Sequence, residues 1–131
     1  MAVMDVLSSR FLLQASDPER SRRFYRDTLG LAVYREFGPP NNPGLVFFLG
    51  GGFLEVSGRA AERAGQGTSL WLQVRDVQQE HSRLLAAGVR VLREPQQEPW
   101  GLIEAWIQDP DGLRLILVQV PDDHPLRRDR R

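Results

Sequence analysis

A strand–helix pattern occurs twice in this chain. Residues 10–30 read RFLLQASDPERSRRFYRDTLG, and residues 69–88 read SLWLQVRDVQQEHSRLLAAG. In each copy a short strand-like run leads to an aspartate, which favours the start of a helix, and the helix closes on a glycine. The two aspartates, Asp17 and Asp76, are 59 positions apart, and the two closing glycines are 58 apart. This constant offset indicates an internal duplication and predicts a binding site in the space between the two copies.

The composition is that of an ordinary soluble globular protein. Of 131 residues, 41% are hydrophobic and 26% are charged, and the formal net charge of +0 favours neither nucleic acid nor an anionic membrane as a partner. The absence of cysteine excludes disulfides, thiolate metal ligands and cysteine nucleophiles. No apolar run is long enough to span a bilayer, and the first ten residues lack the apolar core of a signal peptide. We therefore expect a single cytoplasmic domain without membrane or nucleic-acid partners.

Both copies continue with three predicted strands. The first helix is expected to reach Leu29, followed by strands at 32–37, 45–49 and 53–57; the second ends at Gly88, followed by strands at 89–93, 103–108 and 113–119. GPPNNPG at 38–44 predicts a rim loop, and DPDG at 109–112 predicts a hairpin turn. The resulting organisation is module one at about 8–58, a linker at 59–68, module two at 69–120 and a loosely held charged tail at 121–131.

Alternation within the strands separates an apolar face from a polar one. The apolar face, expected to pack under the helices together with Val77, Leu84 and Leu85 of the second helix, comprises Leu13, Leu54, Val56, Leu70, Leu72, Val74, Leu115 and Leu117. The polar face comprises Arg10, Gln14, Glu55, Ser57, Ser69, Trp71, Gln73, Glu104, Trp106 and Arg114. A sheet that simply faces solvent would show the same pattern. The two tryptophans favour a ligand-binding surface instead, because large rings are seldom left in water without a function.

Three features together resemble the vicinal oxygen chelate superfamily: FYRDTLGL at 24–31, the two aspartate-led helices and the late DPDG. That superfamily includes glyoxalase I, extradiol dioxygenases, fosfomycin-modifying enzymes and bleomycin-resistance proteins. The resemblance extends from Arg10 to about Val120. It implies an α+β fold of two βαβββ modules that form a curled mixed sheet around a cavity, with the helices on the outer face, and it implies a homodimer. It does not settle the function, because one fold hosts unrelated chemistries.

Metal enzymes of that superfamily take ligands from the first and last strands of each module. The matching positions in this chain are Arg10, Glu55, Ser69 and Ile116. Only Glu55 binds a divalent cation well, whereas such a site needs several convergent carboxylate or imidazole ligands. The two histidines do not supply them, because His81 lies within the second predicted helix, where we expect partial exposure, and His124 lies in the tail as a solvated residue. We therefore expect no metal and no cofactor.

An ion pair is expected where a metal would lie. If Arg10 and Glu55 are cross-strand neighbours, as the resemblance suggests, the guanidinium occupies the position of the cation. The alternative is an exposed ion pair of little energetic consequence.

Five aromatic residues are candidates for the walls and lid of a ligand site: Trp71, Trp106, Phe47, Phe53 and Trp100. EPWG at 98–101 is expected to form a flexible approach to a strand, where a gate could operate. The alternative, which applies above all to Phe47 and Trp106, is that the rings belong to the core. Trp71 is the strongest candidate for direct ligand contact.

The sequence thus predicts a metal-free protein that sequesters a planar or apolar small molecule. The candidate ligand-binding residues are Arg10, Gln14, Glu55, Ser69, Trp71, Gln73, Trp100, Trp106 and Arg114. The alternative is an enzyme of the glyoxalase or dioxygenase type. Such an enzyme would be metal-dependent, or metal-free with Glu55 as a base whose pKa is raised by an apolar cavity.

Overall fold

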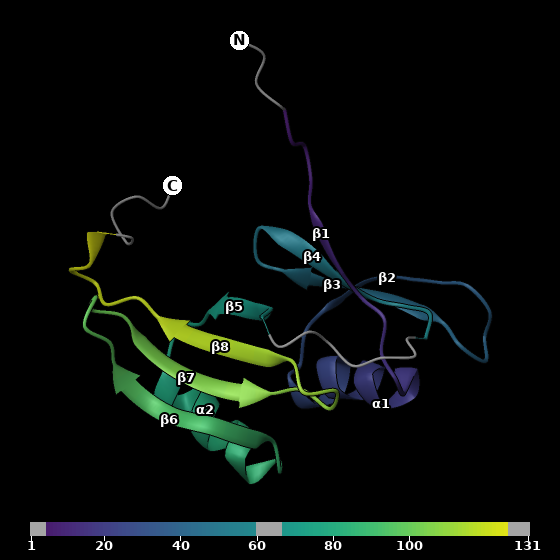
Figure 1. Ribbon diagram of the computed structural model, residues 1–131. Helices are drawn as coiled ribbons and strands as arrows, with labels where there is room; N and C mark the ends of the chain where they lie inside the picture. Colours follow the sequence, from purple (N-terminus) through teal and green to yellow (C-terminus); the bar gives the residue numbers. More distant parts are fainter. Residues whose placement is uncertain (1–4, 60–66, 126–131) are drawn as a thin grey trace. The chain divides into compact units, whose positions relative to one another are not determined.

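The computed structural model describes residues 5–59 and 67–125, which belong to two compact units, Met1–Glu62 and Arg63–Arg131 (Figure 1). Most of the predicted linker and residues 126–131 of the predicted tail lie outside the described residues. Each unit contains a strand, a helical segment and three further strands, in that order. The predicted α+β fold with two βαβββ modules is therefore confirmed.

The first unit forms a four-stranded mixed sheet. Its elements are β1 (Arg10–Leu13), α1 (Pro18–Arg23), the π-helical segment η1 (Phe24–Thr28), β2 (Val33–Phe37), β3 (Gly44–Leu49) and β4 (Gly52–Val56). The strand order is β1-β4-β3-β2, with β1 parallel to β4 and the other pairs antiparallel.

The second unit repeats this topology. Its elements are β5 (Ser69–Gln73), α2 (Val77–Ala86), β6 (Arg90–Gln97), β7 (Ile103–Gln108) and β8 (Arg114–Gln119). The strand order is β5-β8-β7-β6, again with a parallel pair joining the first and last strands of the unit (Figure 1). The repeated strand order gives the same four strand positions in both sheets.

Both helices start as the sequence predicts. The carboxylate of Asp17 accepts a hydrogen bond from the backbone N–H of Arg20 at 3.2 Å, and that of Asp76 accepts from the N–H of Gln79 at 3.1 Å. Each bond satisfies a donor that the first helical turn leaves without an internal partner. The two donor residues, Arg20 and Gln79, are 59 positions apart, and so are the two acceptors, Asp17 and Asp76. The duplication therefore extends to individual hydrogen bonds.

The first helix does not continue to Leu29 in the predicted form. After Arg23 it widens into η1, where the N–H of Leu29 donates to the carbonyl of Phe24 at 2.8 Å. Two consecutive aromatic residues of this segment, Phe24 and Tyr25, are both buried. Gly30, with φ of 79°, ends the segment in the left-handed conformation that glycine favours.

The apolar sheet faces form the core, with three exceptions to the prediction. Buried residues include Leu13, Leu54, Val56, Leu70, Leu115 and Leu117. Leu72 and Val74 are only half-buried. On α2, Val77 and Leu84 are buried but Leu85 is exposed, because one helical residue turns the side chain by about 100° away from the inward stripe.

The two hairpins of the second unit are tightly closed. DPDG forms the predicted turn, in which the carboxylate of Asp109 accepts from the N–H groups of Asp111 and Leu113 at 2.9 and 2.8 Å. EPWG forms the turn between β6 and β7, where the N–H of Glu98 donates to the carbonyl of Leu102 at 2.7 Å. The strand before it, β6, runs to Gln97 and not to Arg93.

Candidate functional site

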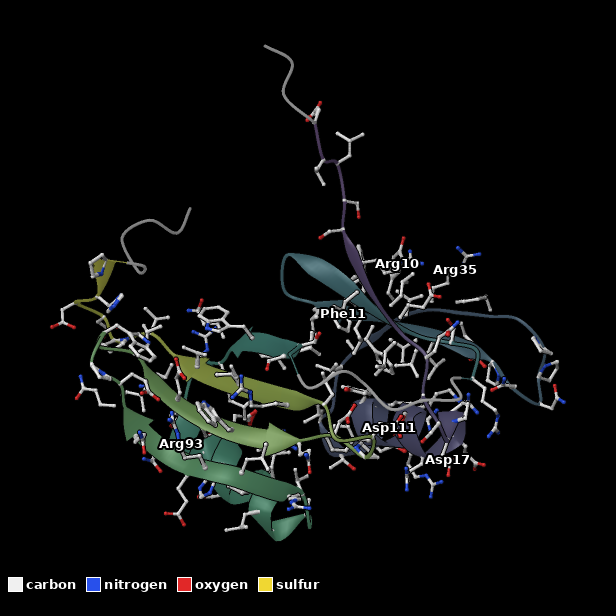
Figure 2. The ribbon with its side chains drawn as sticks, viewed as in Figure 1. Arg10, Phe11, Asp17, Arg35, Arg93 and Asp111 are labelled. Carbon is white, nitrogen blue, oxygen red and sulfur yellow. The ribbon has the colours of Figure 1, made fainter. Side chains whose placement is uncertain are left out.

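The open face of the first sheet, which points away from its buried apolar face, carries the predicted Arg10–Glu55 pair. In the parallel register of β1 and β4, Arg10 lies opposite Phe53 and Leu12 lies opposite Glu55. Arg10 and Glu55 are therefore diagonal neighbours on one face, and Arg10 Nη1 donates to Glu55 Oε1 at 2.8 Å. Figure 2 labels Arg10 on β1. The pair that the sequence predicts is present.

Glu55 is held on both carboxylate oxygens. Ser57 Oγ donates to Oε2 at 2.6 Å while Arg10 binds Oε1, and the Glu55 side chain is 15% exposed. The Ser57 hydroxyl first, and then the Arg10 guanidinium, hold the pKa of Glu55 below its usual range, with Arg35 adding a smaller contribution. The prediction that Glu55 is a base with a raised pKa is therefore wrong: the pKa is lowered, because hydrogen bonds to both oxygens stabilise the charged carboxylate.

A double-mutant cycle on Arg10→Met and Glu55→Gln is expected to give a coupling energy of about 1 kcal/mol at pH 7, because Arg10 keeps 37% exposure and solvent screens the pair. Since the pKa of Glu55 is lowered by folding, the contribution is present above its unfolded value of about 4.3 and is lost as the pH falls through the folded value. Urea titrations of the four proteins at pH 7 and pH 3 measure this. No coupling at pH 7 contradicts the paired geometry.

Three rings form an aromatic cluster beside this pair. The centroids of Tyr34 and Phe48 are 5.1 Å apart, those of Tyr34 and Phe53 are 4.8 Å apart, and the Arg10 guanidinium carbon lies 5.9 Å from the Phe53 centroid. Tyr34 and Phe48 are exposed. The first unit therefore presents an aromatic surface bordered by an ion pair, which suits contact with a flat apolar group.

The open face of the second sheet is organised around Trp106. The guanidinium carbons of Arg93 and Arg114 lie 3.8 and 4.6 Å from its ring centroid. Its Nε1 donates to Glu104 Oε1 at 3.2 Å, and Glu104 is buried. Trp106 is thus half-buried, and its contacts with two arginines and with Glu104 hold these side chains together on the open face.

Glu104 also accepts a hydrogen bond from a second tryptophan, Trp100. Trp100 Nε1 donates to Glu104 Oε2 at 3.3 Å, and the exposed Trp100 ring extends from the turn between β6 and β7. His124 Nε2 contacts the carbonyl of Trp100 at 2.9 Å. The described part of the tail therefore folds back onto this turn, and His124 is not the freely solvated residue that we predicted.

The remaining predicted site residues divide between the two open faces. Ser69 Oγ accepts from Arg114 Nε at 2.9 Å, and exposed Trp71 and half-buried Gln73 follow on the same strand. In the first unit Gln14 lies just beyond β1, packed near Gly58. Phe47, in contrast, is fully buried on the opposite face and belongs to the core.

The four superfamily ligand positions do not fit a metal ion. The registers pair Glu55 with Leu12 and Ile116 with Trp71, so Glu55 and Ile116 occupy equivalent places in the two sheets. Glu55 is engaged by Arg10 and Ser57, and the other three positions offer a guanidinium, a hydroxyl and an alkyl group. Across residues 5–59 and 67–125, no three His, Asp or Glu side chains are grouped to hold a cation. His81 is half-buried on α2, as its predicted partial exposure requires.

Several residues of these faces were not identified from the sequence. They are Tyr34, Phe48, Arg93 and Glu98. Arg93 forms ion pairs with Glu98 and with Glu104. Arg93 lies within the strand predicted at 89–93, but register shifts on both sides of its pairing with Trp106 interrupt the alternation, so the pattern does not place it on this face.

Comparison with known proteins places this chain in a family. Residues 8–117 match the model of the Glyoxalase/Bleomycin resistance protein/Dioxygenase superfamily. The chain therefore belongs to this superfamily, which confirms the resemblance found in the sequence. In the part of the chain that the structure describes, no helix is long and apolar enough to cross a membrane.

Individual relatives are distant in sequence but match over most of their length. A protein of Synechocystis sp. named "Probable lactoylglutathione lyase" is 27% identical over 119 residues, covering 82% of this chain and 91% of its own. The structure of TnmS3, an antibiotic binding protein from Streptomyces sp., is similar with a TM-score of 0.69 and 25% identity, covering 92% of this chain and 99% of its own. A glyoxalase-related enzyme from Fulvimarina pelagi gives 0.70 and 27%, with 90% of each chain covered.

Proposed function

We propose that this protein is a metal-free small-molecule-binding protein of the glyoxalase/bleomycin-resistance type, which sequesters a planar or apolar ligand. The single observation that carries the proposal is the state of Glu55. It is the one acid at the four superfamily ligand positions, and Arg10 and Ser57 bind its two oxygens at 2.8 and 2.6 Å. A cation would have to displace both partners and would find no further carboxylate or imidazole at the other three positions.

The open faces support ligand binding. Large side chains remain exposed on them, including Tyr34 and Phe48 in the first unit and Trp71 in the second. Exposed rings of this size, next to fixed polar groups, are typical of sites that bind flat organic molecules. Similarity to the antibiotic binding protein TnmS3 points the same way. The proposal includes a homodimer, as the superfamily resemblance implies, and a cytoplasmic location, as the sequence without a signal-peptide pattern predicts.

Elemental analysis tests the metal-free part. Protein purified without chelator is expected to contain nickel, zinc, iron and manganese each well below one equivalent, and dialysis against EDTA is expected to leave its thermal midpoint unchanged. The matched variant is Glu55→Gln, which removes the one acid: its residual metal content is expected to equal that of the wild type. Near-stoichiometric metal that Glu55→Gln loses would overturn the proposal.

The second candidate is an enzyme of the glyoxalase or dioxygenase type, favoured by the similarity to the Synechocystis protein. It requires turnover of a hemithioacetal or a catechol after addition of Ni²⁺, Zn²⁺, Fe²⁺ or Mn²⁺, and loss of that turnover in Glu55→Gln. The sequestering protein is expected to return its ligand unchanged. Mass spectrometry of the released ligand separates the two functions.

A further inference from the structure

Three rows of side chains cross the open face of the second sheet, because strand register places their members opposite one another. The first row is Ser69, Arg114 and Gln108; the second is Trp71, Ile116 and Trp106; the third is Gln73, Val118 and Glu104. On these three strands Arg114 therefore lies in one row, the two tryptophans lie in the next and Glu104 lies in the third, and β6 adds Arg93 opposite Trp106. A ligand lying on this face can therefore meet a guanidinium in the first row and an aromatic ring in the second, whereas Val118 and Glu104 of the third row are buried.

The central row offers one accessible ring. Trp106 has two guanidinium groups stacked near it, from Arg93 at 3.8 Å and from Arg114 at 4.6 Å. Trp71 is 48% exposed and has no ring or cation stacked on it among the described residues. Ile116, which is half-buried, lies between the two tryptophans in register. A flat apolar group can therefore stack on Trp71 and extend over Ile116, whereas Trp106 serves as a support for the arginines.

The two arginines differ in their charge balance. Arg93 forms ion pairs with Glu98 and Glu104, so its charge is compensated within the protein. Arg114 donates from Nε to the neutral hydroxyl of Ser69 at 2.9 Å and stacks on Trp106, and no carboxylate of the described residues pairs with it. Its two terminal nitrogens are thus free to donate to a ligand. The orientation of the guanidinium is fixed by the hydrogen bond from Nε to Ser69 and by stacking on the Trp106 ring.

We infer that Arg114 is the anion-recognition residue of this face, and that the ligand is an aromatic anion: a flat ring system on Trp71 carrying a carboxylate, sulfonate or phosphate that accepts hydrogen bonds from the Arg114 fork. The inference rests on the proposed ligand-binding function and specifies its ligand class. A planar guanidinium held in advance matches the geometry of such a group in two parallel hydrogen bonds, and it loses little freedom on binding. Ser69 is its positioning residue.

The test uses three probes of one shape: naphthalene-2-sulfonate, neutral naphthalene-2-sulfonamide and cationic 2-naphthylmethylammonium. Isothermal titration calorimetry on the full chain is expected to give the sulfonate an affinity about 10-fold or more above that of the sulfonamide, with the cation weakest. Arg114→Gln is expected to abolish this preference, Arg114→Lys to retain part of it, and Ser69→Ala to reduce it less than Arg114→Gln. Trp71→Ala is expected to weaken all three probes alike.

The matched control is Arg75→Gln, which removes an exposed cation of the same unit on the segment between β5 and α2 and is expected to leave all three affinities unchanged. Circular dichroism confirms that each variant folds. If the sulfonamide binds as tightly as the sulfonate, or if Arg114→Gln keeps the preference, the anion inference fails while ligand binding stands. If none of the three probes binds, both the inference and the proposed sequestration of planar ligands are contradicted.

Discussion

Replacing Phe47 with alanine is expected to lower the free energy of unfolding by about 3–5 kcal/mol, measured by urea denaturation followed through circular dichroism. The ring is fully buried, lies opposite Leu54 in the register of β3 and β4, and is 6.3 Å from the Tyr25 centroid. Removing it leaves a cavity between the sheet and the first helical segment. Neighbouring groups can fill such a cavity only in part, since interiors are closely packed.

The matched control is the next residue along the same strand. Phe48 lies on the open face and is 47% exposed. Phe48→Ala loses ring contacts with Tyr34 and Phe53 and is expected to cost about 1 kcal/mol, several times less than Phe47→Ala. In ligand-binding assays we expect the reverse: Phe48→Ala weakens ligand binding more than Phe47→Ala, because Phe48 lies on the open face where the ligand would bind. Equal losses of stability would contradict this assignment, and a larger loss for Phe48→Ala would mean that β3 presents the other set of side chains to the core.

The two phenylalanines also show where the sequence alone is insufficient. LVFFL at 45–49 is a continuous apolar run without alternation, so its pattern does not reveal which residues face inward. The antiparallel register with β4, which pairs Phe47 with Leu54 and Phe48 with Phe53, makes that choice. The sequence alone therefore leaves Phe47 between a wall of the site and the core, and it does not single out Phe48.

Features that depend on local chemistry were predicted well. The aspartate caps, the DPDG hairpin and the repeated strand–helix succession along the chain each follow from a few adjacent residues or from a fixed offset, and each is present. The polar faces follow from alternation alone, since a strand places every second side chain on one side. The Arg10–Glu55 bond needed one further assumption, that the first and last strands of a module are neighbours.

Contacts that depend on irregular backbone were not predictable in the same way. Register shifts on both sides of the Arg93–Trp106 pair interrupt the alternation of β6, and Pro95 suggests the end of a strand where the strand in fact continues at the sheet edge. The residues around Trp106 depend on that continuation. The π turn after Arg23 is similar: it adds one residue to a helical turn, which the spacing of apolar residues does not reveal.

The duplicated sheets have diverged most on their open faces. At equivalent places the first sheet has Arg10 opposite Phe53, and the second has Ser69 opposite Arg114. Each pair thus keeps one arginine but on exchanged strands. In the first unit that arginine neutralises Glu55, whereas in the second no acid of the described residues meets it. The cores keep their apolar character in both units, so the difference between the copies is concentrated where a ligand would bind.

Arg93→Met is expected to destabilise the protein by about 3 kcal/mol at neutral pH, because it leaves two carboxylates that are almost fully buried, Glu98 at 5% and Glu104 at 7% side-chain exposure, without their cation. Methionine keeps most of the stem that lies against Trp106, so the loss reports charge more than packing. Adding Glu98→Gln to Arg93→Met is expected to restore part of the stability, since one unpaired charge is then removed. Urea denaturation of the single and double variants measures both effects.

Arg90→Met provides the comparison, because Arg90 lies on the same edge strand, is exposed and forms no ion pair with the described residues. Its loss is expected to stay within about 0.5 kcal/mol, the range of ordinary surface substitutions. Tryptophan emission should change in Arg93→Met and not in Arg90→Met, because Arg93 stacks on Trp106 whereas Arg90 does not. If the two variants lose the same small amount of stability, the carboxylates are not held by Arg93, and the fixed support on which Arg114 stacks would have to be maintained by other contacts.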